Sequence, residues 1–161
     1  MASYIPDLTR DNISLYTIPL YWVISIFPRF YGATLYEAKT KEKMDTRTPR
    51  GFVKQAGDSQ KLDQASKDLI SRTEAAVANS FENFGPFTAA VVAGSAAKVD
   101  PLVLNSLTFV YLGSRVLYSV LYINSTTLAV AKARSAAYVV GLGCLFTMFV
   151  QAGSRFKNAV L

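Results

Sequence analysis

The stretch RTEAAVANSFENFGPFTAAVVAGSAA, residues 72–97, decides the fold. Its second half, Phe87–Ala97, carries no charged residue, whereas its first half carries Arg72, Asn79 and Glu82. Ionised and amide side chains are costly at the start of a membrane helix unless they face polar partners or water. The stretch therefore predicts a membrane helix with a polar face, and it makes that face the first place to look for function.

Similar apolar segments recur along the chain, which has 161 residues, 51% of them hydrophobic. A membrane-spanning helix needs roughly 20 mostly apolar residues. The sequence predicts one all-α domain over residues 1–161, a four-helix transmembrane bundle with spans at about 13–31, 75–97, 102–123 and 135–151. A soluble four-helix bundle would need a polar stripe on every helix. Residues 135–154 have no charged stripe, so that alternative is rejected.

The rare residue types limit the chemistry. The single cysteine, Cys144, lies inside the last apolar segment, so it cannot form an internal disulfide and we expect it to be buried. The chain has no histidine, which removes the commonest general base and metal ligand. We expect no metal site. Asp7 and Asp11 precede the first apolar segment, so we do not interpret it as a cleavable signal.

The distribution of basic residues predicts the orientation in the membrane. The loop 32–70 holds eight of them, and Lys132 in the third connection lies on the same side; the eight are Lys39, Lys41, Lys43, Arg47, Arg50, Lys54, Lys61 and Lys67. The positive-inside rule places this loop in the cytoplasm and both termini in the lumen, with the endoplasmic reticulum as the expected membrane. Six acidic residues are interleaved with the basic ones, which argues against nucleic acid as a partner. The same basic residues would attract anionic lipid headgroups as a side effect.

Local signals place the helix ends. We expect Lys39–Gly57 to be irregular and a helix capped by Asp58 or Ser59 to begin near residue 60 and to continue into the second span. Further on, Asp100 is a good N-cap and Pro101 suits the first position of a helix. The second and third spans should therefore form a tight antiparallel hairpin.

Spacings of three and seven place Arg72, Asn79 and Glu82 on one helix face. One interpretation is a binding site for a zwitterionic ligand. The other is that the side chains hold helices together, with Glu82 paired to Arg115 and Asn79 bonded across an interface. The residues alone leave both interpretations open.

Two further groups lie on the later helices. Arg115, Tyr118 and Tyr122 share a face in the third apolar segment, and we interpret Arg115 as one member of a structural ion pair. Arg134, Ser135 and Tyr138 fall within about one turn at the predicted start of the last helix, where free N–H groups would help to stabilise an anion such as a thiolate. The alternative is an arginine that ends a span by extending to the interface.

Three motifs occur in order: Arg72-x6-Asn79-x2-Glu82-Asn83-x2-Pro86-Phe87, Arg115-Val116-Leu117-Tyr118-x3-Tyr122, and Arg134-Ser135-x2-Tyr138, with Thr48-Pro49-Arg50 before them. Together they resemble the MAPEG family, the membrane-associated proteins in eicosanoid and glutathione metabolism. The resemblance covers roughly residues 13–153, nearly the whole chain.

The resemblance implies a homotrimer of four-helix bundles that holds glutathione between neighbouring subunits near the cytoplasmic face. It implies that Arg134 stabilises the thiolate, with Ser135 able to donate a hydrogen bond to it. The residues expected around the rest of glutathione are Arg29, Arg72, Asn79, Glu82, Tyr118, Tyr122 and Tyr138. The second substrate would be a lipophilic small molecule that reaches the site from the membrane lipid.

One position departs from the family pattern. Members that bind glutathione usually have an arginine four residues before the helix-two asparagine, and here that residue is Ala75. A lost charge-assisted contact is worth roughly 1.5–3 kcal/mol, or about tenfold to a hundredfold in affinity, unless Arg72 compensates. The leading hypothesis is a glutathione-dependent transferase or peroxidase acting on a lipophilic electrophile or hydroperoxide. The alternatives are a non-catalytic lipid-binding scaffold and an isomerase acting on a specialised metabolite.

Overall fold

The computed structural model describes residues 7–159 of the chain, so the ends of the predicted domain, residues 1–6 and 160–161, lie outside the described residues. The described part is helical throughout and has no strand, which confirms the all-α prediction. Its elements are η1 (Ser14–Tyr16), α1 (Thr17–Thr40), η2 (Pro49–Gly51), α2 (Phe52–Asp58), α3 (Gln64–Ala96), α4 (Pro101–Ile123) and α5 (Leu128–Ala159).

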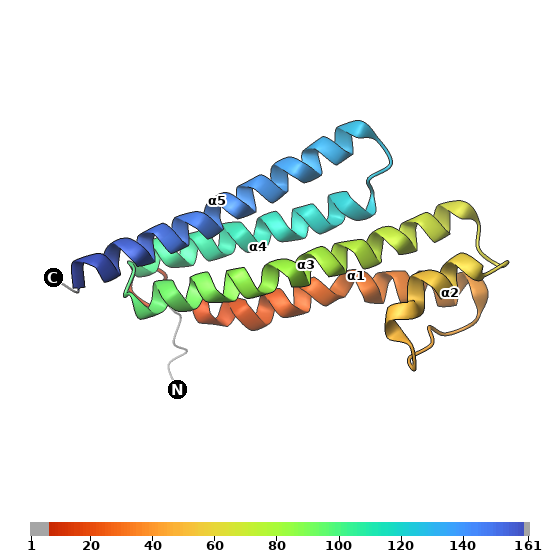
Figure 1. Ribbon diagram of the computed structural model, residues 1–161, viewed down its shortest axis with the longest axis horizontal. Coiled ribbons are helices and arrows are strands. Elements are labelled where there is room, and N and C mark those ends of the chain that lie inside the picture. Colours follow the sequence, from red (N-terminus) through yellow and green to blue (C-terminus); the bar gives the residue numbers. More distant parts are fainter. Residues whose placement is uncertain (1–6, 160–161) are drawn as a thin grey trace.

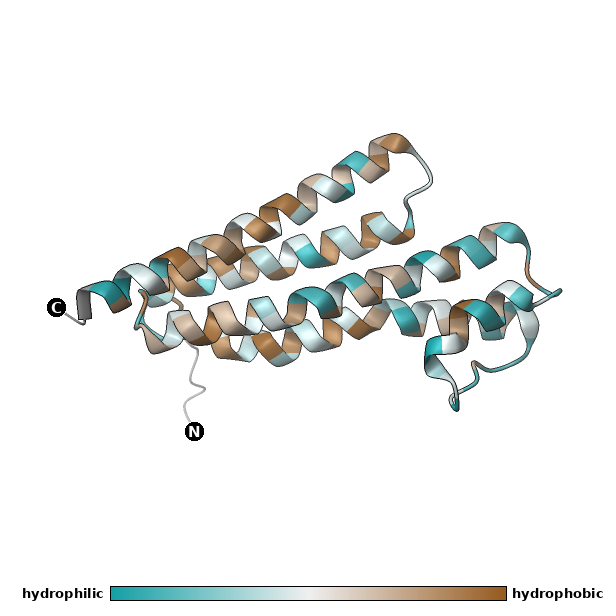
Figure 2. Cartoon of the chain, in the orientation of Figure 1, coloured by the Kyte–Doolittle hydropathy of each residue, from teal (hydrophilic) through white to brown (hydrophobic). Residues whose placement is uncertain are grey.

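The four long helices run side by side, and the short α2 covers the end of α1 and α3 (Figure 1). Within the described residues, α4 and the 128–157 part of α5 are long and apolar enough to cross a membrane. That α1 and α3 also span it stays a prediction. Figure 2 shows hydrophilic residues gathered at the α2 end, whereas hydrophobic residues are more frequent along the rest of the bundle.

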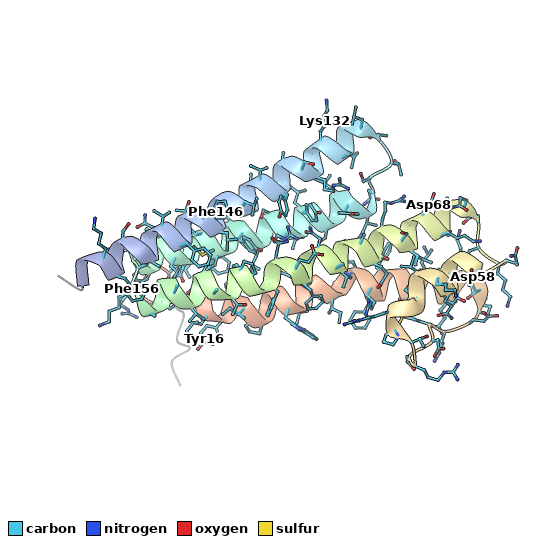
Figure 3. The ribbon with its side chains drawn as sticks, in the orientation of Figure 1. Tyr16, Asp58, Asp68, Lys132, Phe146 and Phe156 are labelled. Carbon is cyan, nitrogen blue, oxygen red and sulfur yellow. The ribbon has the colours of Figure 1, made fainter. Side chains whose placement is uncertain are left out.

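Large apolar side chains lie on the outside of the bundle. Tyr16 and Phe146, both labelled in Figure 3, are 76% and 60% exposed, and Phe27 on α1 is 66% exposed. A water-soluble bundle would bury such residues. Their exposure over much of the surface suits a lipid environment.

Residues 32–70 are more ordered than predicted. α1 continues to Thr40, and η2 and α2 occupy part of Lys39–Gly57, so the expectation of an irregular segment is wrong there. The reason is a small second core at this end of the molecule, which gives the segment apolar surface to pack against. Its buried members are Tyr36, Phe52, Ala56, Leu62 and Ile70.

The same packing moves the start of α3. Asp58 ends α2, and the N-cap of α3 is Asp63, whose carboxylate accepts a hydrogen bond from the Ser66 backbone N–H at 3.0 Å. The predicted cap at Asp58 or Ser59 is therefore wrong. Helix α3 does run on from the connecting segment into the apolar stretch, as predicted. Its 33 residues extend about 50 Å, well beyond a hydrocarbon core of about 30 Å.

The hairpin between α3 and α4 forms as predicted. Asp100 accepts a hydrogen bond from the Val103 N–H at 3.2 Å, and Pro101 is the first residue of α4. The two helices approach closely at Gly94, where a Cβ atom would lie 2.7 Å from the Leu104 side chain. Only a residue without a side chain fits that contact unless Leu104 moves.

The main core lies at the end of the bundle away from α2. Tyr21, Phe87 and Tyr111 form its aromatic centre, with the Phe87 and Tyr111 rings stacked at 4.3 Å. The Tyr21 hydroxyl donates to the Ser80 carbonyl at 3.0 Å, which satisfies its polar group inside the core. Cys144 is buried against this core, as predicted. The core therefore fixes α3, α4 and α5 relative to one another just beyond the polar residues.

Candidate functional site

A pocket of about 260 Å³ opens between α3, α4 and α5. Its lining residues come from all three motifs of the sequence; they are Asn79, Tyr118, Arg134, Ser135, Tyr138 and Val139. Residues from three separate helices thus converge in one protomer, and five of the six were predicted as site residues.

Arg115 is buried next to the pocket, against the lining residues Asn79, Tyr118 and Tyr138. It is 1% exposed, and its Nη2 donates to the Asn79 side-chain oxygen at 2.5 Å. Its guanidinium carbon lies 4.5 Å from the centre of the Tyr118 ring and 5.7 Å from that of Tyr138, so two aromatic faces stabilise the charge. Its Nε has no hydrogen-bond partner in the described residues.

This contact corrects the predicted pairing of Arg115 with Glu82. Glu82 is exposed and forms no ion pair within residues 7–159. Asn79 takes the place of the acid, because it faces α4 while Glu82, three residues on, is rotated toward the surface. The predicted ion pair of Arg115 is therefore wrong within residues 7–159, whereas the predicted bond of Asn79 across a helix interface is confirmed.

Arg134 lies at the side of the pocket. Its guanidinium carbon is 4.5 Å from the centre of the Tyr122 ring, and Tyr122 in turn contacts Tyr118, with ring centres 5.6 Å apart. The Tyr122 ring thus packs against the Arg134 guanidinium, but Tyr122 does not itself line the pocket. No hydrogen bond or ion pair of Arg134 to another described residue is present, so its charge remains available to a ligand.

The surroundings of Arg134 differ from the prediction in one respect. Helix α5 begins at Leu128, where the Thr127 hydroxyl accepts a hydrogen bond from the Val130 N–H at 3.3 Å. Arg134 is therefore in the second turn, and free N–H groups of a helix start do not reach its position. The Ser135 hydroxyl donates to the Ala131 carbonyl at 3.1 Å and would have to leave that bond to reach a ligand.

Besides Tyr122, three predicted residues lie outside the pocket. Arg29 on α1 forms a two-point ion pair with Glu74 on α3, with Nε to Oε1 at 2.9 Å. The Nε of Arg72 donates to the Ile123 carbonyl at 2.8 Å, at the end of α4. Glu82 lies on the exposed side of α3. Within one protomer, none of the three lines the pocket.

The pocket favours an anion. One cation, Arg134, lines it together with two phenols, a second cation, Arg115, is buried against those phenols, and no carboxylate lines it. No group of three or more His, Cys, Asp or Glu residues that could hold a metal ion occurs in the described part of the chain. The arrangement suits stabilisation of a negatively charged atom next to Arg134.

Sequence reasoning missed one residue, Glu74, and one contact, that between Arg115 and Asn79. Glu74 fixes Arg29, and an acid at the level of a basic span end could have indicated that pair. Arg115 was recognised, but its contact with Asn79 depends on how α3 and α4 are rotated against each other. No spacing rule along a single helix gives that rotation.

The comparison with protein families gives one match. The model of the MAPEG family matches residues 13–154, which is most of the chain. No curated protein and no solved structure matches.

Proposed function

Because the chain belongs to the MAPEG family, we propose that it is a membrane-bound, glutathione-dependent enzyme whose pocket between α3, α4 and α5 receives the thiol of glutathione beside Arg134. The reaction is attack by the thiolate on a lipophilic electrophile, which gives a conjugate, or on a hydroperoxide, which is reduced. The lipophilic partner enters from the bilayer.

The observation that carries this proposal is the unpaired charge of Arg134 at a pocket built from all three motifs. A free thiol has a pKa of about 8.5 and is only a few per cent thiolate at neutral pH. A cation at contact distance favours the charged form and so increases the share of the nucleophile. Arg134 is the residue we assign to this role, with Tyr122 behind its guanidinium as a positioning residue.

The residues present fit part of a glutathione molecule. Among the lining residues, Asn79 offers an amide, Tyr118 and Tyr138 offer phenols, and Arg134 offers a guanidinium. At about 260 Å³ the pocket is just below the roughly 300–1,000 Å³ of most small-molecule sites. Glu82 lies outside it on an exposed face of α3. We therefore propose a homotrimer in which a neighbouring protomer completes the site and brings its own Glu82 to the peptide end.

The test uses purified wild type, Arg134→Ala and, as a matched control, Lys132→Ala, which removes an exposed charge two residues away. Thiolate formation in millimolar glutathione is followed by ultraviolet difference absorbance, and turnover with a model electrophile is measured alongside. Arg134→Ala should lose the thiolate signal and most turnover while glutathione affinity stays within a few fold. Full activity in Arg134→Ala would refute the role assigned to it.

A second candidate, a non-catalytic lipid-binding scaffold, is favoured by Ala75 and by the Ser135 hydroxyl, which is bonded within its own helix. It predicts that millimolar glutathione gives neither a thiolate signal nor thermal stabilisation of the wild type. That pair of results would replace the enzyme proposal.

We also propose the endoplasmic reticulum as the location, with both termini lumenal and the α2 end in the cytoplasm. The surplus of basic residues at the α2 end supports this orientation.

A further inference from the structure

A second cavity, on the opposite side of α4 from the pocket, is an apolar groove of about 360 Å³ between α1 and α4. Its walls include Val23 and Phe27 from α1 and Val116 and Val120 from α4, and Tyr31 and Asn124 lie at its α2 end. It shares no lining residue with the pocket that contains Arg134. Its lining would accept a hydrocarbon chain.

One polar group is buried in this apolar lining. Ser119 is 7% exposed, and its hydroxyl has no hydrogen-bond partner in the described residues. Helical serines usually bond a carbonyl in the preceding turn, as Ser25 does to Tyr21 and Ser114 does to Tyr111, both at 2.7 Å. The Ser119 hydroxyl is left free to donate to a ligand in the groove.

A cation, Arg72 of α3, contacts a residue that lines the groove, although Arg72 is not itself a lining residue. The Nε of Arg72 holds the Ile123 carbonyl at 2.8 Å, and Ile123 lines the groove. The next residue of α3, Thr73, lies against Gly32 of α1, where a Cβ would be 2.5 Å from the Thr73 hydroxyl. This close approach brings Arg72 to the corner where α1, α3 and α4 meet. Its terminal amino groups form no hydrogen bond or ion pair with the described residues, so they can meet an anion.

These groups follow a fixed order along the groove. The Ser119 position is four residues, or about 6 Å, deeper than Ile123, and the lining beyond it is apolar. From the Ile123 end inward there is thus a cation next to the groove, then a hydroxyl donor, then hydrocarbon contact. We infer that it binds a glycerophospholipid with an acidic headgroup: phosphate at Arg72, an ester carbonyl at Ser119 and one acyl chain along Val116 and Val120.

A free fatty acid is a poorer fit, because its single carboxylate can reach Arg72 or Ser119 but leaves the other without a partner. The inference does not depend on the proposed glutathione chemistry. A phospholipid bound here would be a structural lipid on the membrane-facing surface of the protein.

The experiment titrates delipidated protein in detergent with dioleoyl phosphatidic acid, dioleoyl phosphatidylcholine or oleic acid. Bound lipid is counted by native mass spectrometry, and the thermal midpoint is recorded. The wild type should retain phosphatidic acid at least tenfold better than phosphatidylcholine. Equal retention of the two phospholipids, or tighter binding of oleic acid than of phosphatidic acid, would overturn the assignment.

Variants locate the site. Arg72→Gln should abolish the preference for phosphatidic acid, and Ser119→Ala should weaken both phospholipids by several fold. Val120→Trp fills the groove from a position that is 52% exposed, so it should fold and block lipid retention while glutathione binding is unchanged. Lys132→Gln, which removes a charge at the same end of the molecule, should alter neither the preference for phosphatidic acid nor the retention of phospholipid. Unchanged retention in Val120→Trp, or an equal effect of Lys132→Gln and Arg72→Gln, would refute a specific site.

Discussion

Substitution of Asn79 and of Glu82 by alanine separates a packing role from a ligand role on the same helix. Asn79 provides the only side-chain oxygen within hydrogen-bond distance of the buried Arg115 guanidinium in the described residues, at 2.5 Å. Glu82 is exposed and unpaired there. We therefore expect Asn79→Ala to lower both stability and glutathione affinity, and Glu82→Ala to lower affinity alone.

The sizes follow from the contacts. A hydrogen bond to a charged group is worth about 1.5–3 kcal/mol. Asn79→Ala would remove this bond from Arg115, whose Nε already has no partner in the described residues, so no nearby group would replace the lost acceptor. For a chain of this size this free energy corresponds to a fall of about 3–12 °C in the thermal midpoint. Glu82→Ala removes no contact within the protomer, so its stability should change by less than about 0.5 kcal/mol. Glu82→Ala removes one charged contact to glutathione, and this should weaken glutathione binding by roughly tenfold to a hundredfold.

The assay is thermal unfolding of the detergent-solubilised protein, without ligand and over a glutathione titration. Asn79→Asp is the matched control: it keeps an oxygen facing Arg115 and should retain stability. The reasoning fails if Glu82→Ala destabilises the ligand-free protein as much as Asn79→Ala does. It also fails if Asn79→Ala melts like the wild type.

Three other perturbations test the packing. Gly32→Ala should destabilise by about 1–3 kcal/mol, because the new Cβ would lie 2.5 Å from a threonine hydroxyl of α3; an unchanged melting curve would contradict the close approach. Glu74→Gln should cost roughly 1.5–3 kcal/mol by leaving Arg29 without its charged partner, and should leave glutathione affinity unchanged; a large affinity loss would return Arg29 to the binding site. Hydrogen bonds from Ser66 hold the pKa of Asp63 below its usual 3.8, so the start of α3 should be stable above that pH and should fray as pH falls through the lower folded value. Proteolysis of the 59–63 segment across this range checks the fraying, and Asp63→Asn should show no such pH dependence.

Helix starts were predictable from sequence where a single local signal dominates. Asp100 and Pro101 determine the first turn of α4 whatever surrounds them, because the capping bond and the proline φ are properties of adjacent residues. The start of α3 was not predictable in this way. Asp58, Ser59 and Asp63 are all competent caps, and Asp63 is used because Phe52 and Ala56 pack into the second core and extend α2 to Asp58.

The pocket was predictable in its composition but not in its internal contacts. Helical periodicity grouped the residues by face only in part: Tyr118 and Tyr138 meet Asn79 and Arg134 in one cavity, whereas Arg72, Glu82 and Tyr122 lie outside it. Periodicity says nothing of how two helices are rotated against each other. That rotation, set by the stacked Phe87 and Tyr111 farther along the bundle, selects Asn79 as the residue that contacts Arg115.

Four arginines, each in or next to an apolar segment, therefore have different roles. They are Arg29, Arg72, Arg115 and Arg134. Arg29 is neutralised by Glu74, and Arg115 is held by Asn79 beneath two aromatic rings. The Nε of Arg72 donates to the backbone carbonyl of Ile123 at the end of α4. Arg134 rests on an aromatic face, which orients a guanidinium without neutralising it. Because an ionised group near lipid is costly unless it meets a counter-charge or water, Arg134, which has neither an acid nor a hydrogen-bond acceptor among the described residues, marks where an anionic ligand gains most.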